Sequence, residues 1–415
     1  MNPVSRRNFL KAIGAGAGAA FASKALPIGN ALAQGAKQRA TVVIYATGGL
    51  NAFFPSAHAF RNKFFSVTDS NIVDLGGGLQ VDKSFYDALS QGNQQADQFL
   101  KAHFASVAVR HGSSNHEVAQ QLTWAGGGKM YPLALAAAMG GTASIKAALV
   151  GGARGAPPPG SSFGGVSLQT IGDVKPIVSS VQGVATDPTE LSKGPAAKAI
   201  LGSQSMSAAL IGENPGSLGT LKSAQQALIE TLQKPAVSFA LDQIPQAYGL
   251  STTAVSFENF ASTMAAAELM IRTGTSVVLA VHADKNGWDT HGDTSGARQR
   301  AMMAKVAPSV GKFIQRMMID PATSSKYDVT IAFLGDFARS GASKSDHAQM
   351  TSGAIIGPRV KTGISGMVQL TTGADPGVAV AAGTPAYEGL WSYLAALSGV
   401  AANPFGANPH GTVIL

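Results

Sequence analysis

The chain contains no cysteine among its 415 residues. This absence excludes disulfide bonds, thiolate zinc sites, iron–sulfur clusters and cysteine nucleophiles. A bound metal would therefore take its ligands from aspartate, glutamate, histidine, asparagine or backbone oxygen. Charged residues are also scarce, at 13% of the chain. Any short segment that concentrates them is consequently a candidate functional site.

Long apolar runs are absent as well, although hydrophobic residues make up 45% of the sequence. No segment after the N-terminal region approaches the 18 consecutive apolar residues of a membrane-spanning helix. The composition is instead that of a folded chain with a substantial core. We expect residues 34–415 to form a single domain without a membrane span.

The N-terminal region combines a basic start with a weakly apolar stretch and a cleavage pattern of small residues, Ala31-Leu32-Ala33. Its motif SRRNFLK (5–11) has the twin-arginine form. We predict that residues 1–33 are a cleaved signal peptide, that the twin-arginine translocase is the partner during export, and that the mature protein is periplasmic or extracellular. The alternative is a basic N-terminal helix that is retained.

The net charge gives little reason to expect a nucleic-acid partner. The predicted signal holds four of the 31 basic residues and none of the 23 acidic ones, so cleavage lowers the net charge from +8 to +4. A mildly basic exported protein lacks the concentrated positive charge typical of nucleic-acid binding.

Short apolar segments alternate with helical patterns along the chain. Apolar residues at helical spacing predict a helix that Ser256 caps and Gly274 ends, and a second helix over 294–318, which Pro308 kinks or begins. Residues 151–165 are too rich in glycine and proline for a regular element. The predicted strands are 41–45, 106–109, 275–283 and 328–334. This order predicts an α/β fold with a mostly parallel central sheet sandwiched by helices.

Polar residues follow each predicted strand. Sites in such sheets form where loops leave the carboxyl ends of the strands. The candidates, in strand order, are Asn51; His116; Asp289, His291 and Asp293; and Asp336, Arg339, Asp346 and His347.

The segment NGWDTHGDTSG (286–296) is the densest of these loops. In extended backbone, residues i and i+2 project to the same side, so Asp289 and His291 can face one cavity. Asp346 and His347 can supply further ligands. Carboxylate and imidazole together suit zinc, manganese, magnesium or calcium, without selecting among them.

Structural alternatives exist for several of these residues. Asp293 can cap the helix that begins near residue 294, and Asp289 can close a turn. His116 can begin a helix rather than contact a ligand. Asp336 and Arg339 can form a salt bridge, or Arg339 can bind an anionic group. Trp288 and His282 are typical of packing residues.

Several motifs follow one another along the chain in a characteristic order. They are the twin-arginine start, the strand ending in Gly-Gly, the Ser/Asn-His loop, and then GWDTHGD, DFARS and DHA. This order resembles the family known as domain of unknown function 1501, whose members look like a branch of the alkaline phosphatase and sulfatase superfamily. The resemblance implies an alkaline-phosphatase-like α/β sandwich and metal-dependent hydrolysis of phosphate or sulfate esters. It implies metal ligands at Asp289, His291, Asp346 and His347.

The resemblance also implies substrate contacts at Arg339, Asp336, His116 and Asn51. Asp336 and Ala338 stand where members usually show Glu and Gly, and Ala348 replaces another glycine. More importantly, the first strand ends TGGLN, with Asn51 where a metal-binding aspartate is common. No nucleophile is selected among Thr47, Ser113 and Ser114.

These observations support two functions. The first is an exported metal-dependent hydrolase acting on phosphate or sulfate esters of small molecules or glycans. The second is a non-catalytic cell-envelope protein that keeps the fold and binds a partner or glycan. The missing aspartate and the unassigned nucleophile favour the second.

Overall fold

The computed structural model describes residues 37–141, 143, 145–173, 243–251, 254–256, 259–283, 287–339, 345–372 and 377–415. The predicted signal peptide, residues 1–33, lies outside them.

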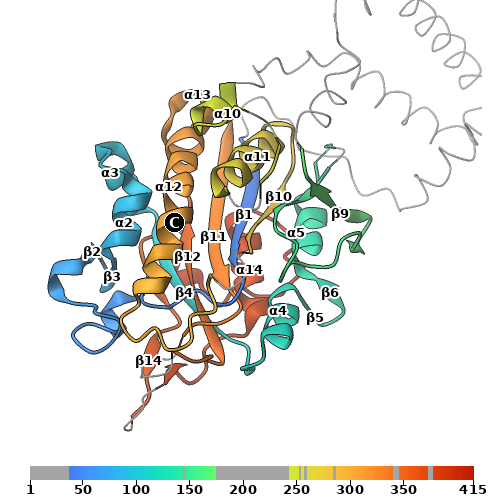
Figure 1. Ribbon diagram of the computed structural model, residues 1–415. Helices are drawn as coiled ribbons and strands as arrows, with labels where there is room; N and C mark the ends of the chain where they lie inside the picture. The colour runs from blue at the N-terminus through green and yellow to red at the C-terminus, as the bar shows by residue number, and fades with distance from the viewer. Residues whose placement is uncertain are drawn as a thin grey trace, which may run out of the picture.

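A nine-stranded sheet forms the centre of the molecule (Figure 1). In spatial order its strands are β13 (Gly363–Ser365), β4 (Phe104–Arg110), β12 (Met350–Ile356), β11 (Tyr327–Gly335), β1 (Gln38–Ala46), β10 (Val277–His282), β7 (Ala147–Gly151), β9 (Val166–Ile171) and β8 (Ser162–Phe163). All except β12 and β8 run in the same direction. The predicted α/β class with a mostly parallel sheet is confirmed.

Helices cover both faces of this sheet. The first face packs against α2 (Lys83–Ser90), α3 (Gln94–Ala102), α10 (Gln243–Ala247), α11 (Phe260–Arg272), α12 (Ala297–Ile314) and the π-helix η3 (Gln315–Ile319). The second face packs against α4 (His116–Trp124), α5 (Tyr131–Met139) and α14 (Tyr387–Leu397).

The smaller elements lie around this sandwich. They are α13 (Pro321–Ser324), the 3-10 helices η1 (Ala57–Ala59), η2 (Asp69–Asn71) and η4 (Gly411–Val413), and the strand pairs β2 (Ile72–Gly76) with β3 (Leu79–Asp82), β5 (Ala125–Gly126) with β6 (Lys129–Met130), and β14 (Val368–Leu370) with β15 (Val378–Val380).

The central strand β1 shows why the sheet is buried on both sides. Val42 and Ile44 face one apolar cluster, whereas Val43 and Tyr45 face the other, and all four are completely buried. Successive residues of a strand point to opposite faces, so a strand covered on both faces must be apolar throughout. Burial of each such aliphatic side chain contributes roughly 1.5–3 kcal/mol.

The predicted strands all form, whereas some predicted boundaries were wrong. α11 begins at Phe260 with Asn259 as its cap instead of Ser256, although Gly274 with φ +105° follows its end as predicted. α12 begins at Ala297 and continues through Pro308, so this proline does not begin the helix. Within 151–165, the two residues of β8 do form regular structure by pairing with β9.

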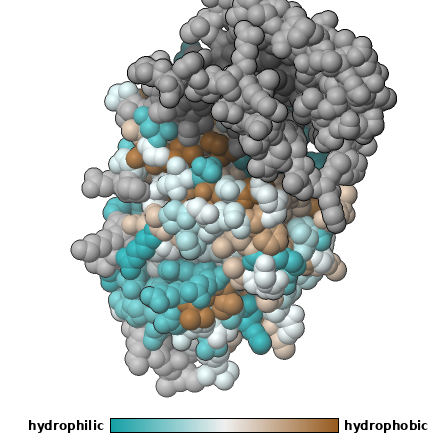
Figure 2. Space-filling view, turned by 90° about the vertical axis from the view of Figure 1, so that its right-hand side faces the viewer, coloured by the Kyte–Doolittle hydropathy of each residue, from teal (hydrophilic) through white to brown (hydrophobic). Residues whose placement is uncertain are grey.

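The exposed surface contains few large apolar side chains. Over the described part of the face in Figure 2, apolar groups lie in small separate patches among hydrophilic surface. The large exposed hydrophobic residues of the described chain are Val118, Leu122, Met367 and Leu415. Within the described ranges, every helix is too short or too polar to cross a bilayer.

The direction of the strands decides which loops meet. Because β1, β4, β10 and β11 run in parallel, the loops that follow them leave at one edge of the sheet. β12 runs in the opposite direction, so the segment before it, residues 345–349, reaches the same edge. The loops after β1, β4 and β10 and the connection between β11 and β12, which are distant from one another in sequence, are thereby brought to one place.

Candidate metal centre

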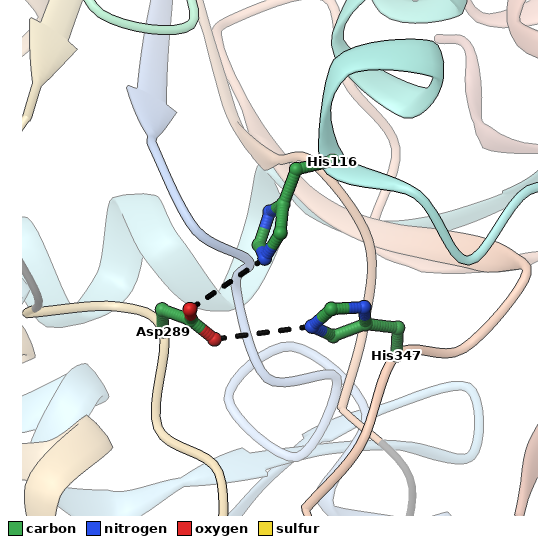
Figure 3. Close-up of side chains that lie close together, drawn as sticks. All are labelled: His116, Asp289 and His347. Carbon is green, nitrogen blue, oxygen red and sulfur yellow. Dashed lines mark ion pairs between the residues drawn. The ribbon is translucent and has the colours of Figure 1, made fainter.

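Three side chains from different segments point toward one another at this edge (Figure 3). Asp289 follows β10, His116 is the first residue of α4, and His347 precedes β12. Asp289 Oδ2 lies 3.7 Å from His116 Nε2, and Asp289 Oδ1 lies 3.8 Å from His347 Nε2. Two imidazole nitrogens therefore face one carboxylate.

The His116 ring is oriented by Asp336, which follows β11. His116 Nδ1 lies 2.7 Å from Asp336 Oδ2. A carboxylate is an acceptor, so this contact places a proton on Nδ1, and in the neutral ring the lone pair is then on Nε2. Nε2 itself is buried and has no hydrogen-bond partner among the described residues.

Asp336 is in turn fixed by three further donors. The Tyr45 hydroxyl donates to Oδ1 at 2.6 Å, and the Gly48 amide and the Gln120 amide nitrogen donate to Oδ2 at 3.1 and 2.9 Å. Burial, together with the charge of Asp336, raises the pKa of Tyr45 well above its usual value, which keeps its hydroxyl a donor. The Asp336 carboxylate is completely buried, so its role is to orient His116.

The His347 ring is fixed in a comparable way. Its Nδ1 lies 2.6 Å from the carbonyl oxygen of Ser114, which only accepts, so Nδ1 carries the proton. The ring stacks on Phe337 with the centroids 4.1 Å apart. Its Nε2 is buried without a partner in the described part of the chain, and burial lowers the pKa of His347. The neutral ring therefore presents a second lone pair.

Asp289 is held by Arg339. The guanidinium donates to Asp289 Oδ1 at 2.6 Å and also to the carbonyl oxygens of Gly48, Trp288 and Ser345. Burial alone would raise the pKa of Asp289, but Arg339 and the neighbouring histidines lower it below its usual value. Burial lowers the pKa of Arg339, which Asp289 opposes. Asp289 is thus kept as an anionic ligand.

His291 and Asp346 lie at the solvent side of this group. His291 Nδ1 is 2.8 Å from Asp289 Oδ1, and its Nε2 is 3.5 Å from Asp346 Oδ1. The side chains of His291 and Asp346 are 49% and 57% exposed, against 29% for His116 and 15% for His347. The backbone N–H of His347 donates to the Asp346 carboxylate and lowers the pKa of Asp346.

The described residues contain two sets of side chains that can hold a metal ion. One set is His116, Asp289 and His347, and the other is His291, Asp346 and His347, each with its ligand atoms within 4.8 Å of one another. Ligands of a tetrahedral zinc ion are about 3.3 Å apart, given bonds of roughly 2.0–2.1 Å. The ligand atoms of the first set lie within 4.8 Å of one another, so small movements of these side chains bring them to this spacing, and two imidazole nitrogens with one carboxylate oxygen fit a divalent ion.

The structure brings the predicted metal ligands Asp289, His291, Asp346 and His347 to one place. The four predicted ligands belong to two different sets, however, and His116 is a further member of the set that contains Asp289. The sequence predicts a substrate contact for His116, and the structure places His116 beside Asp289 and His347. Its dual role is also clear, since Asn115 caps α4 and His116 both begins the helix and faces Asp289.

The other residues predicted to contact substrate lie in the interior of the protein. Asp336, Arg339 and Asn51 are completely buried. Asn51 Oδ1 accepts the N–H of Phe53, which places it in the turn after β1. Arg339 pairs with Asp289 instead of with Asp336, so the expected alternative of an Asp336–Arg339 salt bridge is not the one observed.

Asp293 supports the helix that follows it. Its Oδ2 accepts the N–H of Gln299 in the first turn of α12, although Gly296 occupies the cap position. Asp293 is buried and belongs to neither ligand set. Trp288 is also buried and donates through Nε1 to His282 Nδ1 at 2.8 Å, which confirms both as packing residues.

The two glycines after β1 permit the close approach of these loops. Gly48 and Gly49 have φ values of +114° and +113°. A Cβ on Gly48 would lie 2.8 Å from the Asp289 nitrogen, and one on Gly49 would lie 2.9 Å from the Phe337 carbonyl oxygen. Glycine is required here both for the backbone conformation and for space.

Sequence reasoning did not identify the residues that orient the histidines. Tyr45 lies within an apolar strand, Gln120 lies one helical turn after His116, and Ser114 contributes a backbone carbonyl. A tyrosine near the end of a buried strand and the i, i+4 spacing of His116 and Gln120 were available signals. The Ser114 carbonyl had no such signal, because every residue has a backbone carbonyl.

No family model matches this chain, and no curated protein matches it. Among solved structures, one described as "Crystal structure of Ps i-CgsB in complex with k-i-k-neocarrahexaose" is 11% identical, with 88% of this chain and 72% of that chain covered and a TM-score of 0.35. A likeness of this degree carries no argument about function.

Proposed function

We propose that this chain is an exported, metal-dependent hydrolase of the alkaline phosphatase and sulfatase type that acts on phosphate or sulfate esters. Its sandwich would then be a variant of the fold of that superfamily, and residues 1–33 would be its twin-arginine signal. The order of the sequence motifs and the parallel sheet with its ligand cluster at the carboxyl edge support this proposal.

One observation carries the proposal. Two imidazole rings have their Nδ1 atoms fixed by Asp336 and the Ser114 carbonyl, and both direct a buried Nε2 lone pair toward the Asp289 carboxylate. Leaving two such nitrogens without partners costs free energy, and a divalent cation would recover it. The set of two nitrogens and one carboxylate oxygen suits zinc or manganese better than calcium, which prefers oxygen.

The residues have separate roles in this proposal. His116, Asp289 and His347 bind the ion, Asp336 positions His116, and Arg339 positions Asp289. When bound, a divalent ion would supply Lewis-acid chemistry, namely polarisation of an ester oxygen and compensation of the negative charge of the phosphate or sulfate group. Exposed His291 and Asp346 form the side through which a substrate reaches the ion.

A second function, a non-catalytic binding protein of the cell envelope, is favoured by different observations. The Thr47 hydroxyl donates to the Arg154 carbonyl at 2.7 Å, and the Ser113 hydroxyl accepts the Asn115 N–H. Two of the three candidate nucleophiles are therefore engaged in loop hydrogen bonds. Asn51 supplies no carboxylate at the end of β1.

Metal analysis combined with turnover assays separates the two functions. The mature chain is purified after export, its bound metal is quantified, and aryl phosphate and aryl sulfate esters are tested with zinc, manganese, magnesium and calcium. Ester cleavage that Asp289→Asn abolishes supports the hydrolase. Bound metal that raises the melting temperature without cleavage of any ester supports the binding protein, and absence of bound metal contradicts the hydrolase.

A further inference from the structure

The two ligand sets overlap in a way that limits how many ions they can hold together. His347 is the member that both sets contain. In either set it offers one atom, Nε2, because its Nδ1 carries the proton that it donates to the Ser114 carbonyl at 2.6 Å. One nitrogen lone pair coordinates one ion.

The alternative of an imidazolate bridge between two ions would need Nδ1 to lose this proton. The Ser114 carbonyl oxygen would then face a second lone pair at 2.6 Å, with no donor between them. Acceptor atoms this close repel each other. The contact with Ser114 therefore keeps His347 a ligand for a single ion.

The sets also differ in how far their side chains are prepared. In the inner set, His116 and His347 each have the second ring nitrogen fixed, and Arg339 holds Asp289. In the outer set, His291 Nδ1 also has a carboxylate partner, Asp289 Oδ1 at 2.8 Å. However, the side chains of His291 and Asp346 are about half exposed, whereas those of His116 and His347 are 29% and 15% exposed. Exposed side chains lose more conformational freedom on binding than side chains already held in place. The inner position is thus the tighter of the two.

We infer that the cluster holds one ion per chain, in an inner position between His116, Asp289 and His347 or in a weaker outer position between His291, Asp346 and His347, and that the two positions exclude each other. This inference rests on the proposed function in that it takes the cluster to be a metal site. It departs from a two-ion centre, which would need separate ligand sets.

In the experiment, the metal-free mature chain is titrated with Co²⁺. Binding is monitored by calorimetry and by the visible spectrum of the bound ion. Wild type and the variants His116→Gln, His291→Gln and His347→Gln are compared. His410→Gln is the matched control, because His410 also has a buried Nε2 without a described partner but belongs to neither ligand set. Thermal melts without metal confirm that each variant is folded.

If the two positions exclude each other, wild type should bind one Co²⁺ ion per chain. His291→Gln should also bind one ion, with nearly the same affinity as wild type. His116→Gln should also bind one ion, but at least 10-fold more weakly and with a changed spectrum, because the ion moves to the outer position. His347→Gln should lose binding at both positions, and His410→Gln should match wild type.

If the two positions were independent, wild type would bind two ions per chain. His116→Gln and His291→Gln would then bind one ion each. That stoichiometry would overturn the inference even if only the wild type could be measured. The proposed hydrolase fails separately, if one ion binds as expected and no ester is cleaved. A wild type that binds no Co²⁺ overturns both.

Discussion

Two clusters of charged side chains lie at opposite edges of the central sheet, and they differ in how completely their polar atoms are paired. Glu268 lies near the end of α11, close to the start of β1, where Gln38 donates to the Ile271 carbonyl. Its carboxylate accepts from Arg272 at 2.6 Å, from Arg316 twice at 2.7 Å, and from the Tyr248 hydroxyl at 3.0 Å. Both oxygens of this buried carboxylate are satisfied.

The cluster around Asp289 has the opposite character. Its carboxylate is well held, but His116 and His347 keep buried Nε2 atoms that have no partner in the described structure. Three side chains donate to the Glu268 carboxylate, and they link α11, η3 and Tyr248, which follows α10. Lone pairs that converge without a donor are arranged for a cation. The two clusters therefore differ in what faces the central carboxylate: donors around Glu268, and, beside Asp289, two ring nitrogens without a hydrogen-bond partner in the described structure.

The largest expected effect is the loss of metal binding in Asp289→Asn. The change removes the anionic ligand that both imidazoles face, while the amide oxygen can still accept from Arg339. Changes to residues that hydrogen-bond to a metal ligand typically lower the metal affinity roughly 10–100-fold, and the loss in Asp289→Asn should be larger. Titration calorimetry measures it. Asp87→Asn, which changes an exposed carboxylate paired with Lys83, should bind like wild type.

Glu268→Gln should have the reverse phenotype. The change leaves Arg272 and Arg316, whose side chains are 19% and 24% exposed, without a counter-charge. We expect the free energy of unfolding to drop by about 3 kcal/mol, with the metal affinity unchanged. Urea unfolding measures this loss. Glu388→Gln at the more exposed pair with Lys129 should cost less than about 1 kcal/mol. A metal affinity that falls with Glu268→Gln would contradict the separation of the clusters.

Asp336→Asn tests the positioning of His116. An amide cannot accept from all four donors that surround this carboxylate, so His116 loses its fixed orientation. The metal affinity should fall roughly 10–100-fold. Nitrogen-15 NMR of His116 should show the proton no longer confined to Nδ1, which a general loss of stability would not produce. Tyr45→Phe removes one donor and keeps the ring, and should have a smaller effect.

The smallest effect concerns His410, a buried histidine outside both clusters. Burial lowers the pKa of His410 to about 4. The unfolded chain, with a histidine pKa of about 6.5, therefore binds more protons between these values, and stability falls as the pH falls. From pH 6.5 to 5.5 this residue should cost about 1 kcal/mol. Urea unfolding of His410→Gln should lack this component; equal pH dependence in both proteins would refute it.

Much of the fold follows from local sequence. The strands over 41–45, 106–109, 275–283 and 328–334 were predictable because a strand buried on both faces must be apolar throughout. Helix boundaries were less predictable. The start of α11 depends on Asn259 instead of Ser256, and Gly296 precedes α12 while the Asp293 carboxylate supports its first turn. Competing caps within a few residues have nearly equal intrinsic preference, so tertiary contacts decide between them.

The candidate site was likewise predictable in part from the sequence. Asp289, His291, Asp346 and His347 were identifiable because ligand-type side chains follow or precede buried strands in a chain with few charges. The sequence did not show that β12 is antiparallel, although this direction is what carries Asp346 and His347 to the edge where β10 ends. Nor did it show the separation of the ligands into two sets.

By itself, the sequence determined the chemistry that is available: oxygen and imidazole ligands without thiolates, on loops that follow apolar strands. The tertiary structure decided the state of each ligand. Whether His116 presents Nε2 depends on Asp336, which is 220 positions away, and whether His347 does so depends on a backbone carbonyl 233 positions away. A histidine lone pair is set by the partner of its other nitrogen, and such partners are chosen by the packing of distant segments.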